Sequence, residues 1–538
     1  MFSLNAFLFG VAALFFLAIY KFAIHHAFLS PLSKVPNAHW SSPISPFWIL
    51  WTRFLNGENR AVHAAHLKHG PVIRLAPNEL SVNDLAGLRT VYAGGFEKGE
   101  WYSIFDNYGV PCMFSSWHSR PHSARKRMIS NIYSKSNIHN SPALLAQAQV
   151  ILYNRLLPLL TSTISPLSHP NGVDVHEIWN STTMDFITAY LFGLKNASNF
   201  LRDEIYRKHW FQLYHSRKTY TFFPQELPHL TNFLKKLHIY LVPTWVDAAN
   251  RELEAWTQER CDITSTYIKN GAASKDDDPA NEPVVLGALL AGIEKEEKIK
   301  GAESVLKDET LKFPELSVAS EMIDHLAAGH ETAGITLTYL SWELSHNISL
   351  QDALRAELLL LSPNMSLTIA NSSRSIPPSK DLDSLPLLHA ILMETLRLHA
   401  AIPGNQPRMT PYPSCTLGRF TEIPGGVRVG SHAHIVHRNP EVYPEPEKFN
   451  HLRWMDDQNS YTEEQRRERD RWFWAFSSGG RMCVGSNFAM HEIKLIVAAV
   501  YSNFRTHIVN DEGIEQTDGY TCGPAGNKLF LRFERVID

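Results

Sequence analysis

The sequence has few cysteines, little net charge and no dinucleotide-binding motif, and each of these absences excludes a class of protein. Its five cysteines are scattered, odd in number and form no CxxC pair, so neither a disulfide framework nor a zinc site is expected. The 538 residues include 51 basic and 54 acidic side chains, a net charge of -3 that gives no reason to expect nucleic-acid binding. No GxGxxG motif follows a predicted strand, so the chain itself is not expected to bind a flavin or nicotinamide dinucleotide. We expect the main body to fold in a reducing compartment.

The one long apolar run lies at the amino end. Phe2 to Tyr20 carries no charge, and about 19 residues in a helix span about 28 Å, the thickness of a bilayer core. A cleaved signal peptide is the alternative, although such peptides usually have a basic start and a shorter apolar core. Positive charge follows the run at Lys21 and Lys34. The sequence therefore predicts a single transmembrane anchor over residues 1–24, with the carboxyl side facing the cytosol from the endoplasmic reticulum.

The rest of the chain divides into a short linker and one large unit. Four prolines predict an extended spacer over residues 25–48, at Pro31, Pro36, Pro43 and Pro46. Residues 70–82 alternate apolar and polar residues around a central turn, which predicts a strand hairpin. Helical periodicity dominates elsewhere, most clearly over 124–133, 173–192 and 316–344. We predict a mainly α protein with minor β, whose single catalytic domain covers residues 49–538.

One cysteine stands in an unusual setting, the segment FSSGGRMCVG from Phe476 to Gly485. A thiol binds metal as thiolate, and its pKa falls when backbone amides and a helix amino terminus point at it. A predicted helix over 486–504 begins just after Cys483. The glycines allow a bulky flat group to lie against the backbone, and Arg481 offers a cation for a carboxylate. The alternative is a buried, inert cysteine.

The segment resembles the haem-binding loop of the cytochrome P450 family. The family's pattern is Phe-x-x-Gly-x-Arg-x-Cys-x-Gly, and its fixed positions are filled here by Phe476, Gly479, Arg481, Cys483 and Gly485. The resemblance implies haem b as the cofactor, with Cys483 as the axial ligand of its iron. It also implies a cytochrome P450 fold behind the transmembrane helix.

A second motif of the family is a Glu-x-x-Arg pair upstream of the loop. Glu394 and Arg397 stand at i and i+3, on one face of a predicted helix rich in leucine. Such pairs are often solvated ion pairs on a surface, but the apolar neighbours favour burial. The family adds an arginine from a downstream segment, which Arg453 fills, although His451 and Leu452 depart from the usual local sequence. The resemblance implies that these three residues form a structural triad.

A third motif lies in the long central helix, where the family activates dioxygen. The segment MIDHLAAGHETAG contains Ala328, Gly329, Glu331 and Thr332. Ala328 and Gly329 precede Thr332 by one turn, so small side chains would make room for dioxygen beside the hydroxyl. The resemblance makes Thr332 the residue that hydrogen-bonds dioxygen and Glu331 a proton relay, both catalytic. The alternative is a threonine bonded back to a helix carbonyl beside an acid on a wet face. Ala333 departs from the family, where a second hydroxyl residue is common.

Haem carries two propionates, which need basic partners when buried. By position in the family, four residues would hold them: His122, Arg125, Arg408 and Arg481. The first two belong to a cluster that departs from the family's Trp-x-x-x-Arg form, because His122 stands where tryptophan is common. A solvated basic face is the alternative for Arg125 and its neighbours.

The resemblance implies a monooxygenase that oxidises an apolar small molecule with O₂. Electrons would come from NADPH through a membrane-bound NADPH-cytochrome P450 reductase. Several segments look like P450s of filamentous fungi that tailor secondary metabolites. Aromatic residues in the predicted pocket segment 101–116 would suit a bulky apolar substrate. The alternatives are a haem-thiolate isomerase or dehydratase that needs no reductase, and a non-catalytic haem-binding membrane protein.

Overall fold

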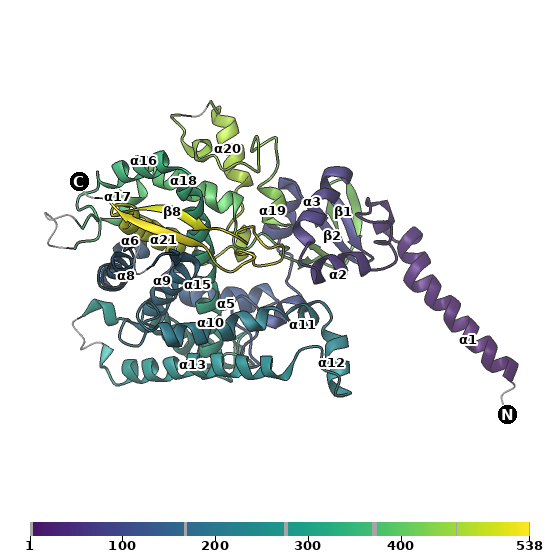
Figure 1. Ribbon diagram of the computed structural model, residues 1–538. Helices are drawn as coiled ribbons and strands as arrows, with labels where there is room; N and C mark the ends of the chain where they lie inside the picture. Colours follow the sequence, from purple (N-terminus) through teal and green to yellow (C-terminus); the bar gives the residue numbers. More distant parts are fainter. Residues whose placement is uncertain (1–3, 166–168, 274–277, 368–373, 459, 537–538) are drawn as a thin grey trace.

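The computed structural model describes residues 4–165, 169–273, 278–367, 374–458 and 460–536, which form a mainly helical body with small sheets (Figure 1). Its helices are α1 (Leu4–Ile19), α2 (Phe47–Phe54), α3 (Glu58–His69), α4 (Leu85–Leu88), α5 (Ser119–Ile129), α6 (Lys135–Asn140), α7 (Pro142–Gln149), α8 (Leu157–Ser162), α9 (Val175–Phe192), α10 (Glu204–Lys218), α11 (Phe222–Glu226), α12 (Pro228–Lys236), α13 (Thr244–Lys269), α14 (Val284–Lys300), α15 (Pro314–Ser345), α16 (Ile348–Leu358), α17 (Ser379–Asp383), α18 (Pro386–Leu398), α19 (Ala433–Val436), α20 (Glu463–Trp472) and α21 (Ser486–Tyr501).

Three small sheets complete the body. The largest has the order β1-β2-β7-β4, from β1 (Val72–Ala76), β2 (Glu79–Val82), β7 (Arg428–Gly430) and β4 (Arg408–Met409). The others are β3-β9-β8, from β3 (Val173–Asp174), β9 (Phe530–Arg535) and β8 (Phe504–Asn510), and the pair β5 (Ser414–Leu417) and β6 (Phe420–Pro424). β1 and β2 pair antiparallel, which confirms the predicted hairpin.

The central helix α15 packs along α9 inside the largest apolar cluster. Both helices fall within one or two residues of the predicted ranges, whereas α5 lies earlier than the predicted 124–133. A Cβ on Gly329 would lie 2.6 Å from Cγ1 of Ile187 in α9, and one on Gly334 would lie 2.6 Å from Oδ1 of Asn180. These glycines let two backbones approach closely. The small size of Gly329 therefore serves helix packing, and the expectation that it makes room for dioxygen was wrong.

At the amino end, α1 projects away from the body on the side of α2 and the β1-β2 sheet (Figure 1). Its apolar side chains are exposed, among them Phe7, Phe9, Leu14 and Phe16. Within the described ranges, α7, the π-helix η5 (Val150–Leu156) and α8 form one continuous helical run, Pro142–Ser162, that is long and apolar enough to cross a membrane. This run is mostly buried and belongs to the core. The apolar stretch Phe7–Leu17 at the amino end is shorter.

The segment after α1 differs from the predicted extended spacer. A π-helix continues from Tyr20 to Leu29, and a short 3₁₀ helix spans Pro31–Lys34. Leu32 and Val35 are buried in the apolar cluster around the β-sheet. Arg74 of β1 also donates from Nη1 to the carbonyl oxygen of His26 at 3.0 Å. The prolines do end the helix, but apolar residues between them pack onto the body instead of leaving a free arm.

Candidate functional site

The loop that presents Cys483 is closed on itself. The backbone N–H of Cys483 donates to the carbonyl oxygen of Phe476 at 3.0 Å, and Phe476 packs half-buried against the main core. Gly479 has a φ of 72°, and a Cβ there would lie 2.1 Å from the carbonyl oxygen of Tyr92. A Cβ on Gly480 or Gly485 would meet nothing within 4 Å. Gly479 is therefore needed to form the loop, and the other two glycines border open space.

The thiol of Cys483 faces the interior of the molecule. Its residue is exposed, yet burial raises the pKa of the thiol above its usual value, and Asp324 of α15 adds to that rise. Surface accessibility together with desolvation means that the Cys483 thiol lies against an internal space of the protein and not on its outer surface. The backbone N–H of Gly485 and the charge of Lys126 oppose the shift, as the helix start predicts, but burial outweighs them. A bound metal cation would reverse this balance, because it deprotonates a coordinating thiol.

The predicted side chains of α15 lie in different surroundings. Ala328 is exposed in the middle of an otherwise buried helix, so it faces an internal space. Thr332 donates from its hydroxyl to the carbonyl oxygen of Ala328 at 2.8 Å, the back-bond that a purely structural threonine would also make. Glu331 is buried, not on a wet face. It accepts a hydrogen bond from the Tyr214 hydroxyl at 2.9 Å and pairs with Lys218, both from α10.

The predicted basic residues gather around the segment before α5. Arg481 donates to the carbonyl oxygens of Ser116 and Trp117, each at 2.7 Å. Arg125 donates to the Ser116 hydroxyl at 2.8 Å and pairs with Glu309 at 2.7 Å. Arg408 is buried, and its Nη1 donates to the Tyr102 hydroxyl at 2.8 Å. Ser116 thus brings Arg125 and Arg481 together, while Arg408 joins them from β4.

His122 belongs to this group but not as a cation. Burial lowers the pKa of its imidazole to about 3, helped by the charges of Arg481, Lys98, Lys126 and Arg408. Histidine is therefore neutral there at physiological pH. The prediction of His122 as a positive partner needs this correction, because a neutral imidazole would serve a carboxylate only as an N–H donor.

Lys98 completes the group, and sequence analysis missed it. Its ammonium is buried, donates to the carbonyl oxygen of Phe114 at 2.5 Å and lies 3.9 Å from the ring centroid of Tyr102. Burial lowers the pKa of Lys98 well below its usual value, and the charges of Arg408 and Arg481 lower it further. Burial and Arg408 also lower the pKa of Arg481. Glu97, which pairs with Arg481 at 3.0 Å, opposes the shift of Arg481. The group of Lys98, Arg408 and Arg481, called the cation cradle below, brings buried like charges together and can hold an anion.

Glu394, Arg397 and Arg453 lie together in the interior. Arg397 donates two hydrogen bonds of 2.8 Å to the two carboxylate oxygens of Glu394, and Arg453 donates one of 3.1 Å. The Trp454 indole and the Asn450 backbone N–H each add a bond of 2.9 Å. Burial would raise the pKa of Glu394, but these hydrogen bonds and the charge of Arg397 hold it below its usual value. The carboxylate is therefore ionised and fully bonded.

His437 connects this group to the cysteine loop and was also missed. Its Nδ1 donates to the carbonyl oxygen of Arg397 at 2.9 Å, and its Nε2 accepts from the backbone N–H of Trp474 at 2.8 Å. Burial and the charge of Arg397 lower its pKa to about 3, which agrees with the neutral tautomer that these bonds require. Trp474 lies two residues before Phe476, so the loop is fixed to α18 through one imidazole.

Comparisons with known proteins agree with these motifs. The family model described as Cytochrome P450 matches residues 46–529. The chain is 27% identical to the cytochrome P450 monooxygenase avaI of Aspergillus versicolor, over 80% of this chain and 94% of the relative. It is 24% identical to the cytochrome P450 monooxygenase FGM1 of Gibberella zeae, over 91% and 90%. It is also 24% identical to a fusicoccadiene C-8 hydroxylase of Phomopsis amygdali, over 89% and 86%.

Replacing Glu394 by alanine should prevent stable folding. The change leaves Arg397 buried beside no carboxylate, and breaking a buried ion pair in this way costs about 3–5 kcal/mol. We expect the yield of soluble protein to fall strongly and the midpoint of thermal unfolding to drop. Glu463→Ala is the control, because that carboxylate is exposed and pairs with the exposed Arg467. A well-folded Glu394→Ala protein would remove the structural role assigned to the triad.

Proposed function

The chain belongs to the cytochrome P450 family, and we propose that it is a haem-thiolate monooxygenase that uses O₂ and electrons from NADPH to oxidise an apolar small molecule. The observation that carries the proposal is the position of Cys483, a desolvated thiol just before the start of α21 and two residues after Arg481 of the cation cradle. The electrons would arrive from NADPH-cytochrome P450 reductase, because the sequence has no dinucleotide fingerprint of its own.

The residues present fit haem b. Cys483 would be the axial thiolate, and the open space beside Gly480 and Gly485 would take the edge of a flat ring. Arg408, Arg481 and Lys98 would hold the propionates, with His122 as a neutral donor and Arg125 as a support through Ser116. Two carboxylates would relieve the mutual repulsion of these cations. Bound in this way, haem with a thiolate ligand supplies the activation of O₂ and the cleavage of the O–O bond.

Thr332 and Glu331 would handle protons on the side of α15. The Thr332 hydroxyl donates to Ala328, which leaves its oxygen lone pairs free to accept a hydrogen bond. The Tyr214 hydroxyl and the Lys218 ammonium place two proton donors at the carboxylate of Glu331. Tyr214 and Lys218 could therefore return a proton to the Glu331 carboxylate without bulk water, and Glu331 would be the relay that serves Thr332 in the family's motif.

Aromatic side chains support an apolar substrate. Edge-on or tilted ring contacts, with centroid distances between 4.9 and 6.3 Å, join Trp101, Tyr102, Phe105, Phe114 and Tyr520. Tyr102 of this group bonds Arg408 of the cation cradle, so the aromatic surface adjoins the proposed haem position. A relative named for hydroxylation of fusicoccadiene supports hydroxylation of a carbon skeleton in fungal secondary metabolism.

The exposed apolar helix α1 supports attachment to a membrane. Side chains such as Phe9 and Phe16 would be unfavourable in water and suit a lipid environment. We place the anchor in residues 1–24, a single pass through the endoplasmic reticulum membrane with the catalytic domain facing the cytosol. This domain would begin after residue 48, close to the start of the family match at residue 46.

The reduced protein should bind carbon monoxide with the Soret band that thiolate-ligated haem gives. Cys483→Ser should lose that band, because a serine hydroxyl does not form the thiolate bond. The measurement is the difference spectrum of reduced protein with and without carbon monoxide. A wild-type protein that never shows the band would overturn the proposed function.

Lys98→Met should weaken retention of haem. The neutral side chain keeps the shape but removes a buried charge facing the propionates, so we expect haem to transfer to an acceptor apoprotein at least about tenfold faster. Lys208→Met is the control, because Lys208 is exposed near the start of α10 and pairs there with the exposed Glu204. Equal transfer rates in wild type and Lys98→Met would exclude Lys98 from the cradle.

Thr332→Ala should uncouple electron use from product formation. Loss of the hydroxyl should lower the product formed per NADPH consumed by at least about tenfold, because proton delivery contributes a factor of that size or more. The assay uses reductase and the substrate found by feeding candidate scaffolds to expressing cells. Thr336→Ala is a matched control, since Thr336 makes the same back-bond to the Thr332 carbonyl oxygen at 2.9 Å. Unchanged coupling in Thr332→Ala would rule out the proton role.

A further inference from the structure

Asp324 of α15 is an acidic side chain on the helix face that borders the internal space. It precedes Ala328 by one helical turn and Thr332 by two, so the three residues share one face of α15. Asp324 and Thr332 are half-buried and Ala328 is exposed, whereas the flanking Ile323 and His325 are buried. The carboxyl group of Asp324 therefore opens into the same internal space as Ala328.

This carboxyl group is shielded from bulk water. Burial raises the pKa of Asp324 to about 7, and the charge of Glu321 adds to the rise, while His325, Lys98 and the Cys112 thiol oppose it. A side chain that is accessible and yet desolvated to this extent lies in an enclosed space. The interior thus contains an acidic group whose charge is poorly solvated.

No lysine, arginine or histidine forms an ion pair with Asp324 in the part of the chain that the structure describes. The adjacent acid, Glu321, is already occupied: its Oε2 accepts from the backbone N–H of Met113 at 2.8 Å, and its Oε1 lies 3.3 Å from Nε2 of His325. Lys98 acts on Asp324 as a charge beyond ion-pair distance. Asp324 is therefore left without a cationic partner of its own.

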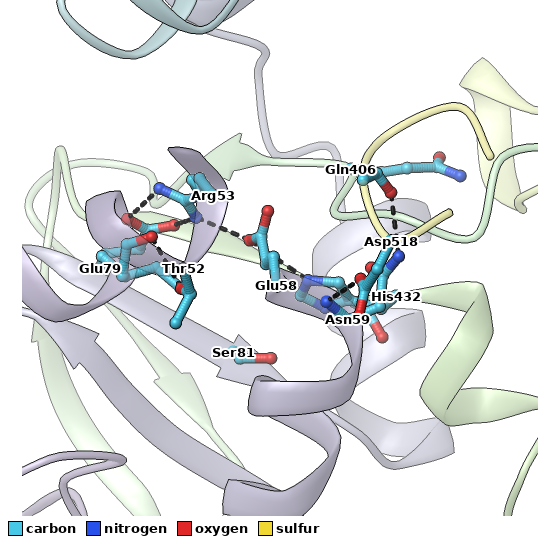
Figure 2. Close-up of polar contacts among 12 residues, drawn as sticks. Thr52, Arg53, Glu58, Asn59, Glu79, Ser81, Gln406, His432 and Asp518 are labelled. Atoms are coloured by element: carbon cyan, nitrogen blue, oxygen red, sulfur yellow. Dashed lines mark hydrogen bonds and ion pairs between the residues drawn. The ribbon is translucent and has the colours of Figure 1, made fainter. Parts of the chain in front are cut away.

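Other acidic side chains of the interior are neutralised by arginine. Figure 2 shows Arg53 between Glu58 and Glu79, and Arg53 also pairs with Glu226 at 3.1 Å. A buried carboxylate without such a partner is unfavourable, and a cation that binds beside it removes part of that cost. A perturbed acid at an internal space is also typical of a ligand site. Asp324 has both properties.

Aromatic rings from two remote segments lie within reach of the Asp324 charge. Burial raises the pKa of Tyr214 of α10 to about 12, and Asp324 adds to the rise. Burial also raises the pKa of Tyr520 well above its usual value, with contributions from Tyr102 and Asp324. A carboxylate near aromatic rings suits an ammonium group, which gains an ion pair and attraction to the ring faces. A neutral hydroxyl group would gain only a hydrogen bond.

We propose that Asp324 binds the positively charged nitrogen of the substrate, so that the molecule oxidised is an amine with an apolar body. The inference rests on the proposed function, because it assigns a substrate class to that enzyme. The cation cradle would not repel such an amine once the haem propionates neutralise it. Asp324 is then a specificity-determining residue, which holds the charged end of the molecule while aromatic side chains contact the rest.

The test uses benzyltrimethylammonium, whose nitrogen does not bind iron, and its neutral isostere neopentylbenzene. Both are titrated into haem-containing full-length protein by calorimetry. Asp324→Asn keeps the shape but removes the charge, so the Kd of the cation should rise at least about tenfold, while the Kd of the isostere stays within about twofold. In wild type, 4-phenylimidazole, which binds haem iron, should displace the cation from the internal space.

Glu315→Gln is the matched control for the loss of one negative charge. Glu315 stands exposed in the first turn of the same helix, so its replacement should leave the Kd of the cation within about twofold of wild type. Asp324→Glu keeps the charge and should bind the cation more tightly than Asp324→Asn does.

The stability of Asp324→Asn separates ligand binding from a structural role. Its midpoint of thermal unfolding should not fall, because the change breaks no ion pair. A fall in that midpoint, a wild type that does not bind the cation, or an equal Kd of the cation in wild type and Asp324→Asn would overturn the assignment. If wild type lacks the thiolate band, the proposed function fails, while calorimetry still decides whether Asp324 binds a cation.

Discussion

The buried carboxylate of Glu394 is the constraint on which the packing of α18 against the segment before the cysteine loop depends. It accepts five hydrogen bonds from Arg397, Asn450, Arg453 and Trp454. Arg397 then donates to the carbonyl oxygens of His437, Pro446 and Lys448. Because His437 also accepts from the backbone N–H of Trp474, the segment just before the cysteine loop is connected through Arg397 to the Glu394 carboxylate.

A second constraint acts around the proposed haem position and has the opposite character. The Glu394 carboxylate is satisfied by the protein alone, whereas the charge of Arg408 lowers the pKa of both Lys98 and Arg481. Glu97 offsets part of this repulsion by pairing with Arg481 at 3.0 Å, and a dianionic group would offset more, so part of its binding free energy would come from charges that the fold has already brought together. The neutral His122 fits the same logic, because a further positive charge there would add repulsion without adding a bond.

The sequence predicted local features well and distant contacts poorly. The spacing of Glu394 and Arg397, the loop around Cys483 and the hairpin at residues 70–82 are properties of neighbouring residues, and the structure has each of them. Lys98, His437 and Glu226 gave no local signal, because their partners come from remote segments. Gly329 was misread for the same reason, since the side chain that requires it, Ile187, lies on another helix. The proline-rich segment was predicted to be a free spacer because the sequence does not show that Leu32 and Val35 pack on the sheet.

The two buried ionic clusters differ in the ratio of carboxylates to guanidinium groups, and this ratio decides what the loss of one carboxylate would cost. Within the described chain, Glu394 is the carboxylate that pairs with the fully buried Arg397, so its departure would strand a cation in the interior. Around Arg53 and Arg428 there are two guanidinium groups for three carboxylates, those of Glu58, Glu79 and Glu226. Removing one carboxylate would therefore strand a buried cation at Arg397, whereas the arginines of the second cluster would keep carboxylate partners.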